Sequence, residues 1–370
     1  MKKTTIAESC TLHARIGWQG LTKKEYLNEG DYYLVTGVDF CNGHIDFKNC
    51  HYVTKDRYDQ DKHIQIHEGD VLVTKDGTIG KVAIIDEPVD KPATLNSGVF
   101  VVRPKNENEL LPRYLVYVLL SNHFSRFIEQ IKVGCTIAHL NQEKFLKYEF
   151  PLPTIEEQMI IIELFDNLST VLSQRTEQIK LLDELIKARF VEMFGDQGDN
   201  PLGFEVGTLK DVADIYLGLT HTPTYVDSGR PFLSVRDISS GTIDFSNCHY
   251  ITEEEFQSLP KGARPMANDL LFCRVGTIGK PVIVPEGIPE FGSFVSVGFL
   301  RKKENVLNEY LKSWMEDPFF MKQVYDNVAG ASQINLNTGW LKNFRIIVPP
   351  LDLQKQFAAF VEQVDKSKVS

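Results

Sequence analysis

The sequence predicts an α+β protein in which two homologous mixed α/β domains are joined by long coiled-coil helices. Three observations carry this prediction: an internal repeat, short β-rich runs in each copy of it, and a heptad pattern between the copies. We expect a first domain at 1–150, a long helix at 151–196, a second domain at 197–348 and a truncated second helix at 349–370.

The internal repeat is the most specific signal. The stretch from Gly43 to Thr54 recurs from Gly241 to Thr252, displaced by 198 residues, and the turn 77–81 recurs at 276–280, displaced by 199. Leu140-Asn141 recurs as Leu336-Asn337, displaced by 196, and Pro151 and Gln158 pair with Pro349 and Gln356. Because solenoid repeats have periods of roughly 20–50 residues, this spacing indicates two copies of one domain.

Each copy begins with strands and continues with helices. Runs of β-branched and aromatic residues at 71–74 and 81–85 flank a glycine turn and predict a hairpin, followed by a strand at 99–102. The second copy repeats these runs at 270–273, 281–284 and 297–300. Helical patterning follows at 112–131 and at 308–327.

A long helix is expected at 155–194, because apolar residues recur there every seven positions. Its length of about 60 Å exceeds what one small domain covers, which favours an interdomain or intersubunit coiled coil over an amphipathic helix packed on one domain. The expected subunit-interface residues are Phe165, Leu168, Leu172, Ile179, Leu182, Ile186 and Met193.

The composition is that of a globular cytoplasmic protein. With 42% hydrophobic and 24% charged residues, the chain contains no apolar run of the roughly 18 residues that a membrane span requires. Lys2 and Lys3 are not followed by an apolar stretch, which argues against a signal peptide. The six cysteines form no C-x-x-C pair, so we expect reduced thiols rather than disulfides or a metal site.

The net charge of −10 does not exclude nucleic acid. Residues 151–200 carry 10 Asp and Glu against 4 Lys and Arg, so this segment supplies six of the ten excess negative charges. The two large segments are close to neutral, and each could present a basic face.

Catalytic motifs are missing from the sequence. The turn 77–81 lacks the spacing and the Ser or Thr of a P-loop, and there is no G-x-S-x-G, H-E-x-x-H or G-x-G-x-x-G. Cys50 and His51 are adjacent on an expected strand and would point to opposite faces, which disfavours a catalytic dyad. We therefore expect no catalytic residues, no cofactor and no bound metal.

The repeat blocks contain residues suited to DNA. Basic residues flank both glycine turns, whose threonines and free amides fit phosphate groups. The copies differ at Gly37-Val38 against Val235-Arg236, at 136–139 against 332–335, and in the first loop at 18–24 against 218–224. Such differences fit contacts to different base edges, the alternative being surface loops that have drifted. The candidate DNA-binding residues are Gln19, Lys23, Lys24, Lys75, Thr78, Lys81, Thr136, His139, Thr220, His221, Arg236, Arg274, Thr277, Lys280, Ser332, Gln333 and Asn335.

The whole chain resembles the specificity (S) subunit of Type I restriction-modification systems. The resemblance rests on the tandem organisation, on the blocks GDVLVTKDGTIGKV and NDLLFCRVGTIGKP, on the start of the long helix at Pro151–Gln158, and on GASQINLNTGWLKNFRIIVPP before the second helix.

The resemblance implies a non-catalytic subunit with two target-recognition domains. Each would recognise a few base pairs of a bipartite site in double-stranded DNA, and the helices would set the spacer between the two halves. Partner methyltransferase (M) subunits, which methylate adenine, and restriction (R) subunits would supply the chemistry.

One departure from the family pattern concerns the second helix, which spans only some twenty residues. We expect it to leave apolar positions of the first helix exposed, so that residues 155–175 mediate self-association or bind methyltransferase helices. Two alternatives remain: a duplicated coiled-coil scaffold for protein interactions that does not bind DNA, and a stand-alone enzyme of unrecognised type.

Overall fold

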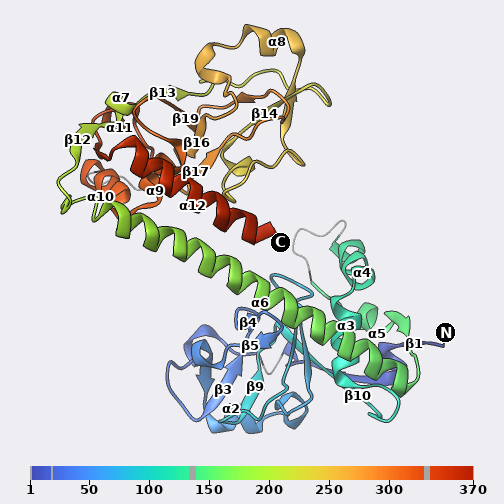
Figure 1. The fold of residues 1–370 in the computed structure, drawn as a ribbon. Coiled ribbons are helices and arrows are strands. Elements are labelled where there is room, and N and C mark those ends of the chain that lie inside the picture. Colours follow the sequence, from blue (N-terminus) through green and yellow to red (C-terminus); the bar gives the residue numbers. More distant parts are fainter. Residues whose placement is uncertain (1, 18–19, 133–138, 329–333, 370) are drawn as a thin grey trace. The chain divides into compact units, whose positions relative to one another are not determined.

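The computed structural model describes residues 2–17, 20–132, 139–328 and 334–369. The chain divides into two compact units, unit 1 at Met1–Gln174 and unit 2 at Arg175–Ser370. The long helix α6 (Ile155–Phe194) begins in unit 1 and ends in unit 2 (Figure 1). The 40-residue helix predicted from the heptad pattern is confirmed, with the predicted bounds.

Unit 1 is built on a four-stranded antiparallel sheet of order β2-β10-β7-β8. Its strands are β2 (Cys10–His13), β10 (Val99–Pro104), β7 (Val71–Thr74) and β8 (Val82–Ile84). A three-stranded sheet, β6-β3-β9, pairs β3 antiparallel to β6 and parallel to β9. Its strands are β3 (Tyr32–Val35), β6 (His51–Val53) and β9 (Ala93–Leu95), and two smaller pairs join β1 (Lys3–Thr5) to β11 (Glu149–Pro151) and β4 (Phe40–Cys41) to β5 (His44–Ile45).

Unit 2 repeats this topology. Its four-stranded sheet has the order β13-β19-β16-β17, its three-stranded sheet the order β15-β14-β18, and β12 pairs with β20. The register is also shared, since Val101 lies between His13 and Leu72 in unit 1 and Phe299 lies between Tyr216 and Leu271 in unit 2. The strands are β12 (Glu205–Thr208), β13 (Ala213–Leu217), β14 (Arg230–Leu233), β15 (His249–Ile251), β16 (Leu270–Cys273), β17 (Gly279–Ile283), β18 (Gly292–Ser293), β19 (Val297–Lys302) and β20 (Arg345–Val348).

The predicted helical stretches each form two helices. Ser121 and Asp317 adopt extended backbone conformations and separate the members of each pair. The helices of unit 1 are α1 (Ile6–Ser9), α2 (Lys55–Asp59), α3 (Pro112–Leu120), α4 (Asn122–Lys132) and α5 (Gln142–Leu146). Those of unit 2 are α7 (Leu209–Val212), α8 (Glu253–Ser258), α9 (Asn308–Glu316), α10 (Pro318–Asn327), α11 (Thr338–Leu341) and α12 (Leu351–Val369). None of the helices in the described residues is long and apolar enough to cross a membrane.

Each four-stranded sheet is buried on both faces. Val71 and Val73 pack into one hydrophobic cluster with the α3 residues, whereas Leu72 between them packs into a second cluster with the three-stranded sheet. Unit 2 repeats this alternation, with Phe272 in one cluster and Leu271 in another. Successive residues of a strand point to opposite faces, so these uninterrupted apolar strands form the centre of each unit.

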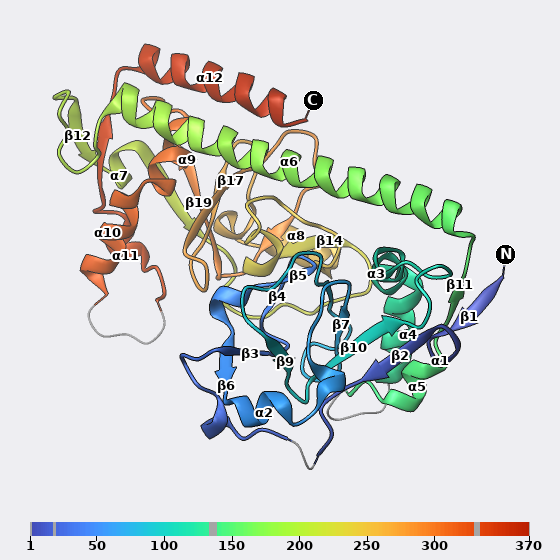
Figure 2. The same cartoon turned by 90° about the horizontal axis from the view of Figure 1, so that it is seen from below.

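Helix α12 lies antiparallel along the second half of α6 (Figures 1 and 2). Near its start, the Phe357 ring lies 5.6 Å from Phe190, and near its end the Lys368 ammonium lies 2.7 Å from an Asp183 carboxylate oxygen. Met193 is only 8% exposed and belongs to the core of unit 2, and Ile186 packs against that core. These two heptad positions therefore serve packing within the chain, which corrects the expectation of an interface with another subunit.

The repeat register at the start of the two long helices also needs correction. Gln158 in α6 and Gln354 in α12 are both fully buried, whereas Gln356 is exposed. Gln158 donates to the Pro153 carbonyl and Gln354 donates to the Pro349 carbonyl, so the displacement here is 196 residues. The sequence pairing with Gln356 was wrong because it followed the displacement of 198 seen earlier in the chain.

Candidate nucleic-acid interface

Four loops of unit 1 meet beside the ends of β3 and β7. The Asn96 amide donates to the Val35 carbonyl at 2.9 Å, and the Lys75 amide donates to the Gly98 carbonyl at 2.9 Å. The Leu140 amide donates to the Lys75 carbonyl at 2.8 Å. We call residues 36–39, 75–81, 96–98 and 139–140 the loop edge of unit 1.

Unit 2 contains the same arrangement. The Phe294 amide donates to the Leu233 carbonyl at 2.8 Å, and the Arg274 amide donates to the Ser296 carbonyl at 2.9 Å. The Leu336 amide donates to the Arg274 carbonyl at 2.9 Å. Residues 234–237, 274–280, 294–296 and 335–336 form the loop edge of unit 2, so the loops that the sequence singled out separately lie together in each unit.

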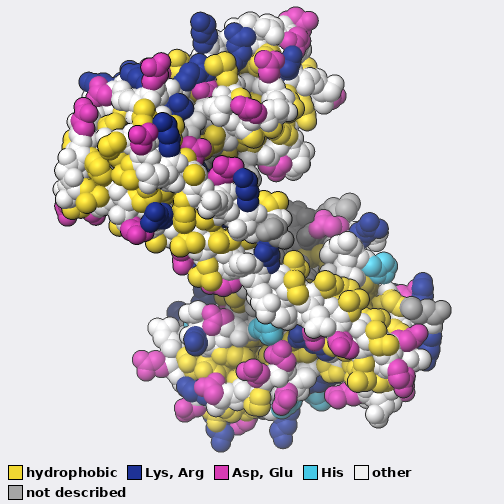
Figure 3. All heavy atoms as spheres, viewed as in Figure 1, with side chains coloured by type: hydrophobic (Ala, Val, Ile, Leu, Met, Phe, Trp, Pro, Cys, Tyr) yellow, Lys and Arg dark blue, Asp and Glu magenta, His cyan; other side chains and the backbone are white. Residues whose placement is uncertain are grey.

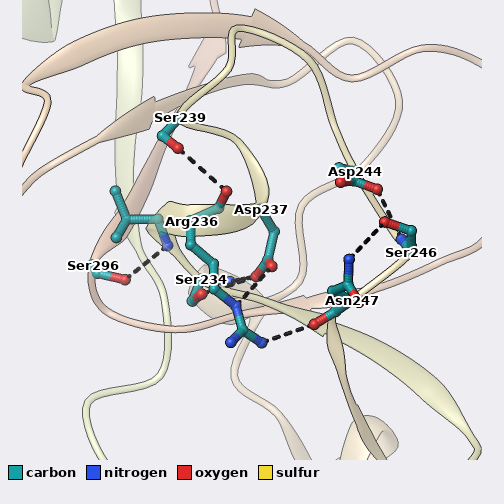
Figure 4. Close-up of polar contacts among 9 residues, drawn as sticks. Ser234, Arg236, Asp237, Ser239, Asp244, Ser246, Asn247 and Ser296 are labelled. Atoms are coloured by element: carbon teal, nitrogen blue, oxygen red, sulfur yellow. Dashed lines mark hydrogen bonds and ion pairs between the residues drawn. The ribbon is translucent and has the colours of Figure 1, made fainter. Parts of the chain in front are cut away.

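A shared scaffold shapes the first loop of both edges. In unit 1 the backbone amide and hydroxyl of Thr36 donate to one carboxylate oxygen of Asp39, at 2.7 and 2.8 Å. In unit 2 the amide and hydroxyl of Ser234 donate in the same way to Asp237, at 2.6 and 2.9 Å (Figure 4). Both aspartates are buried, so each loop has a fixed base from which the intervening residues project.

The residue before this aspartate differs between the units. In unit 2 it is Arg236, whose Nε donates to Asp237 Oδ1 at 3.1 Å and whose Nη2 donates to the Asn247 carbonyl at 2.9 Å (Figure 4). The side chain remains 55% exposed. In unit 1 the same position holds Val38, which is exposed and which the sequence-based candidates did not include. Its alignment with Arg236 in the repeat was the signal that could have identified it.

The glycine turns present polar groups to solvent. Gly77 and Gly276 both adopt a φ of +69°, which a residue with a side chain rarely takes. Thr78, Thr277 and Lys280 are exposed and Lys81 is half-buried. Lys75 is half-buried as well, with its ammonium 5.1 Å from the centre of the Phe100 ring.

Arg274 does not fit the role expected from the sequence. It is only 9% exposed, and its guanidinium donates to the Leu336 carbonyl at 3.0 Å, the Val295 carbonyl at 2.7 Å and Asn335 Oδ1 at 3.3 Å. Burial lowers the pKa of this guanidinium. Arg274 thus ties three segments of the loop edge together, and its donors are directed at the protein rather than at a phosphate.

The last loop differs between the units in the same region. In unit 1 the His139 imidazole is hydrogen-bonded through Nδ1 to the Asp76 carboxylate of the hairpin, and both side chains are about half exposed. In unit 2 the corresponding Asn335 accepts its hydrogen bond from Arg274. Both residues therefore hold the hairpin while lying at the loop edge.

The remaining candidates are placed as follows. Lys23 and Lys24 are exposed in the 3-10 turn Lys23–Glu25, and the following Tyr26 hydroxyl accepts from the Asn96 side chain. Thr220 and His221 are exposed directly after Leu219, whose amide donates to the Ser293 carbonyl. Gln19, Thr136, Ser332 and Gln333 lie outside the described residues.

The first half of α6 presents a large apolar surface, as expected from the sequence. Exposed apolar side chains recur at three- to four-residue spacing along it, and Figure 3 shows hydrophobic side chains gathered on the surface along α6. We call this set the α6 apolar face: Met159, Ile160, Leu164, Phe165, Leu168, Val171 and Leu172. Further along, Ile179 is 37% exposed and Leu182 is half-buried.

The cysteine–histidine pairs do not form nucleophilic sites. Cys50 and Cys248 are buried, and burial is the main cause that raises the pKa of each thiol. Among the described residues, no group of three His, Cys, Asp or Glu side chains could hold a metal ion.

Comparison with known proteins assigns the family. The sequence model of the Type I restriction modification DNA specificity domain matches twice, at residues 16–182 and 201–370. The chain belongs to this family. Its members are the non-catalytic components of Type I restriction-modification systems that specify the DNA sequence, and this chain contains two such domains.

Individual relatives agree with this assignment. The Type I restriction enzyme MjaVIII specificity subunit of Methanocaldococcus jannaschii is 24% identical over 324 residues, which cover 82% of this chain and 74% of the relative. The crystal structure of a Type I restriction-modification S subunit from M. genitalium has the same fold, with a TM-score of 0.53, 15% identity and coverage of 99% of this chain and 90% of that one. A chain from a structural study of the assembly and conformational transition of a type I restriction-modification system matches with a TM-score of 0.54, 17% identity and coverage of 100% and 90%.

Proposed function

We propose that this chain recognises a bipartite double-stranded DNA target and directs partner methyltransferase and restriction subunits to it. The recognition domains are residues 1–150 and 197–348, and each contacts one half of the target. The long helix at 151–196 and the helix at 349–370 set the distance between the halves. The complex acts in the cytoplasm, where it meets chromosomal DNA.

The observation that carries this proposal is the duplicated loop edge. Both edges have the same hydrogen-bonded scaffold, yet their exposed side chains differ, as at Val38 and Arg236. A common scaffold with different exposed side chains suits two recognition elements that contact different base sequences. A protein-interaction scaffold without DNA binding would not require this pattern.

Each loop edge has groups for both kinds of DNA contact. Lys81, Lys280 and the exposed hydroxyls of Thr78 and Thr277 contact phosphates and orient the domain, together with Lys23 and Lys24. Arg236, His139, Thr220 and His221 contact base edges, as do the candidates outside the described residues. Lys75 and Asn335 have a smaller part, because both are engaged within the protein.

The α6 apolar face is the surface for partner subunits. Its apolar side chains are 43–67% exposed, so each would contribute roughly half of the ~1.5–3 kcal/mol that full burial of such a side chain gives. Large contiguous apolar patches of this kind mark interaction sites. We assign this face to the methyltransferase helices, or to a second copy of the chain.

A domain exchange tests the proposal. Residues 197–348 are replaced by the corresponding domain of a relative, and the DNA sequence methylated by the complex is determined. The proposal requires that one half of the target changes and the other half stays the same. A chimaera that folds but changes both halves together contradicts independent recognition by the two domains.

A further inference from the structure

We infer that position 38 in unit 1 and position 236 in unit 2 are equivalent specificity positions, at which Val38 selects thymine through its methyl groups and Arg236 selects guanine. This inference rests on the proposed function and assigns a base preference to one position in each half of the target. It adds Val38 as a DNA-contacting residue.

The loops around the two positions share their anchoring hydrogen bonds. Besides the shared hydrogen bonds of Thr36 and Ser234, the Asp39 amide donates to the Thr36 carbonyl at 3.3 Å and the Asp237 amide to the Ser234 carbonyl at 3.0 Å. The carbonyls of these aspartates accept from the amides of Asp46 and Asp244, both at 2.9 Å. Val38 and Arg236 therefore project from loops anchored by the same hydrogen bonds, with a 3-10 turn at Val235–Asp237 and an ordinary turn at 37–38.

The Val38 side chain is exposed to solvent although it is apolar. Its exposed fraction is 84%, whereas the neighbouring Thr36 and Asp39 are about 5% exposed. Gly37 packs close to Thr74: a side-chain Cβ at position 37 would lie only 3.4 Å from Thr74 Cγ2. The loop is thus anchored on both sides of Val38 and presents it outward. The thymine methyl is the one apolar group in the major groove, and an aliphatic side chain is suited to it.

The Arg236 guanidinium is held in place by two neighbouring residues. Asp237 Oδ1 accepts from Nε and the Asn247 carbonyl accepts from Nη2. Within the described residues Nη1 makes no hydrogen bond, so Nη1 and the second hydrogen of Nη2 are available for two acceptors. Guanine offers two such acceptors, O6 and N7, in the major groove. The buried Asp237 reduces the entropy that the arginine would lose on binding.

Val38→Arg should reproduce the unit 2 arrangement in unit 1. Asp39 is buried in the same place as Asp237, and among the described residues it has no cationic partner. The new guanidinium would therefore find a carboxylate that orients it. The reciprocal variant Arg236→Val removes the guanidinium from unit 2, and Arg236→Lys keeps the charge without the paired donors.

The test is selection of preferred sequences from a duplex DNA library of randomised positions, using the full chain with its methyltransferase subunit. Val38→Arg should replace a thymine preference by guanine at one position of one half of the target. Arg236→Val and Arg236→Lys should each lose a guanine preference of about 5- to 150-fold at one position of the other half. Leu120→Arg, which adds an arginine at an exposed site outside the loop edge, should leave both halves unchanged.

Two outcomes overturn the inference in different ways. A wild-type bipartite preference that survives unaltered in both Val38→Arg and Arg236→Val removes the specificity role and leaves the proposed function intact. A wild-type complex that selects no bipartite sequence removes the proposed function and the inference together. Thermal unfolding curves matching the wild type show that the variants fold, as expected for side chains on an exposed loop tip.

Discussion

Gln158 and Gln354 occupy the same buried position in the two halves of the chain. The Oε1 atom of Gln158 accepts from the Leu111 amide at 2.9 Å, and that of Gln354 accepts from the Leu307 amide at 2.9 Å. Their Nε2 atoms donate to two carbonyls each. One is that of Pro153 or Pro349, two residues before the long helix begins, and the other is that of Glu109 or Asn305, three residues before α3 or α9. Each glutamine thus joins the start of a long helix to the segment preceding α3 or α9.

Replacing either glutamine by alanine should destabilise its unit. Gln158→Ala and Gln354→Ala each remove the partner of one partly buried backbone amide and of two carbonyls, which costs about 1–3 kcal/mol. Urea unfolding of the purified chain measures the loss. Gln356→Ala is the control, since this exposed side chain should change the free energy of unfolding by less than about 0.5 kcal/mol. Equal losses for Gln354→Ala and Gln356→Ala would contradict the register of the repeat.

The lysines that follow the glycine turns should contribute to DNA affinity without selecting sequence. Lys81→Ala and Lys280→Ala should weaken binding about equally on all duplexes, and each should reduce the slope of log affinity against log salt by about one unit. Lys355→Ala, on the exposed side of α12, is the matched control. Filter binding or fluorescence anisotropy over a salt series gives the slopes. If both variants kept the wild-type slope, the glycine turns would not contact phosphate.

The α6 apolar face should mediate association. The purified chain should form dimers at tens of micromolar or require its methyltransferase subunit for solubility, and Leu164→Glu with Leu168→Glu should weaken this association at least about tenfold. Leu168 is 48% exposed, so the substitution leaves the core of unit 1 intact. Leu202→Glu, at an exposed loop site, is the control. Sedimentation velocity measures the oligomeric state. A monomer that also fails to bind the methyltransferase would contradict the assignment of the α6 apolar face as an interaction surface.

The buried cysteines should resist modification. Burial raises the pKa of Cys10 to about 11 and also raises the pKa of Cys50, Cys248 and Cys273, so at pH 8 these thiols remain protonated. Cys41 is exposed and should react with iodoacetamide within minutes. Mass spectrometry of peptides before and after unfolding checks this difference. Rapid labelling of Cys50 in the folded chain would reopen the hypothesis of a reactive thiol.

The sequence was sufficient for the duplicated architecture and the long helix, because both depend on local patterns. The heptad pattern predicted α6 with its bounds, and the runs at 71–74 and 270–273 are β7 and β16. The three-stranded sheets were not predicted. Their strands are short, and the parallel pairing of β3 with β9 joins residues some 60 positions apart, which no local pattern indicates.

The sequence predicted which loops form the candidate site, but it did not predict what each side chain contacts. Arg274 and Lys75 precede the two glycine turns, yet the structure buries the first and places the second against an aromatic ring. Met193 fits the heptad pattern but lies in the core of unit 2, since periodicity does not say which neighbour covers a helix face. Val38 was noted opposite Arg236 where the two copies differ, but it was not among the candidate DNA-binding residues.

If the two different loop edges make this chain select a bipartite DNA sequence for its partner subunits, adenine methylation in cells must depend on the chain. Single-molecule mapping of methylated adenines, in cells carrying the methyltransferase subunit with and without this chain, tests it most directly. Recognition by two independent domains requires methylation confined to one bipartite sequence, present only when the chain is expressed and altered in one half by the domain exchange. Methylation that is independent of the chain, or that follows a single uninterrupted sequence, would contradict it.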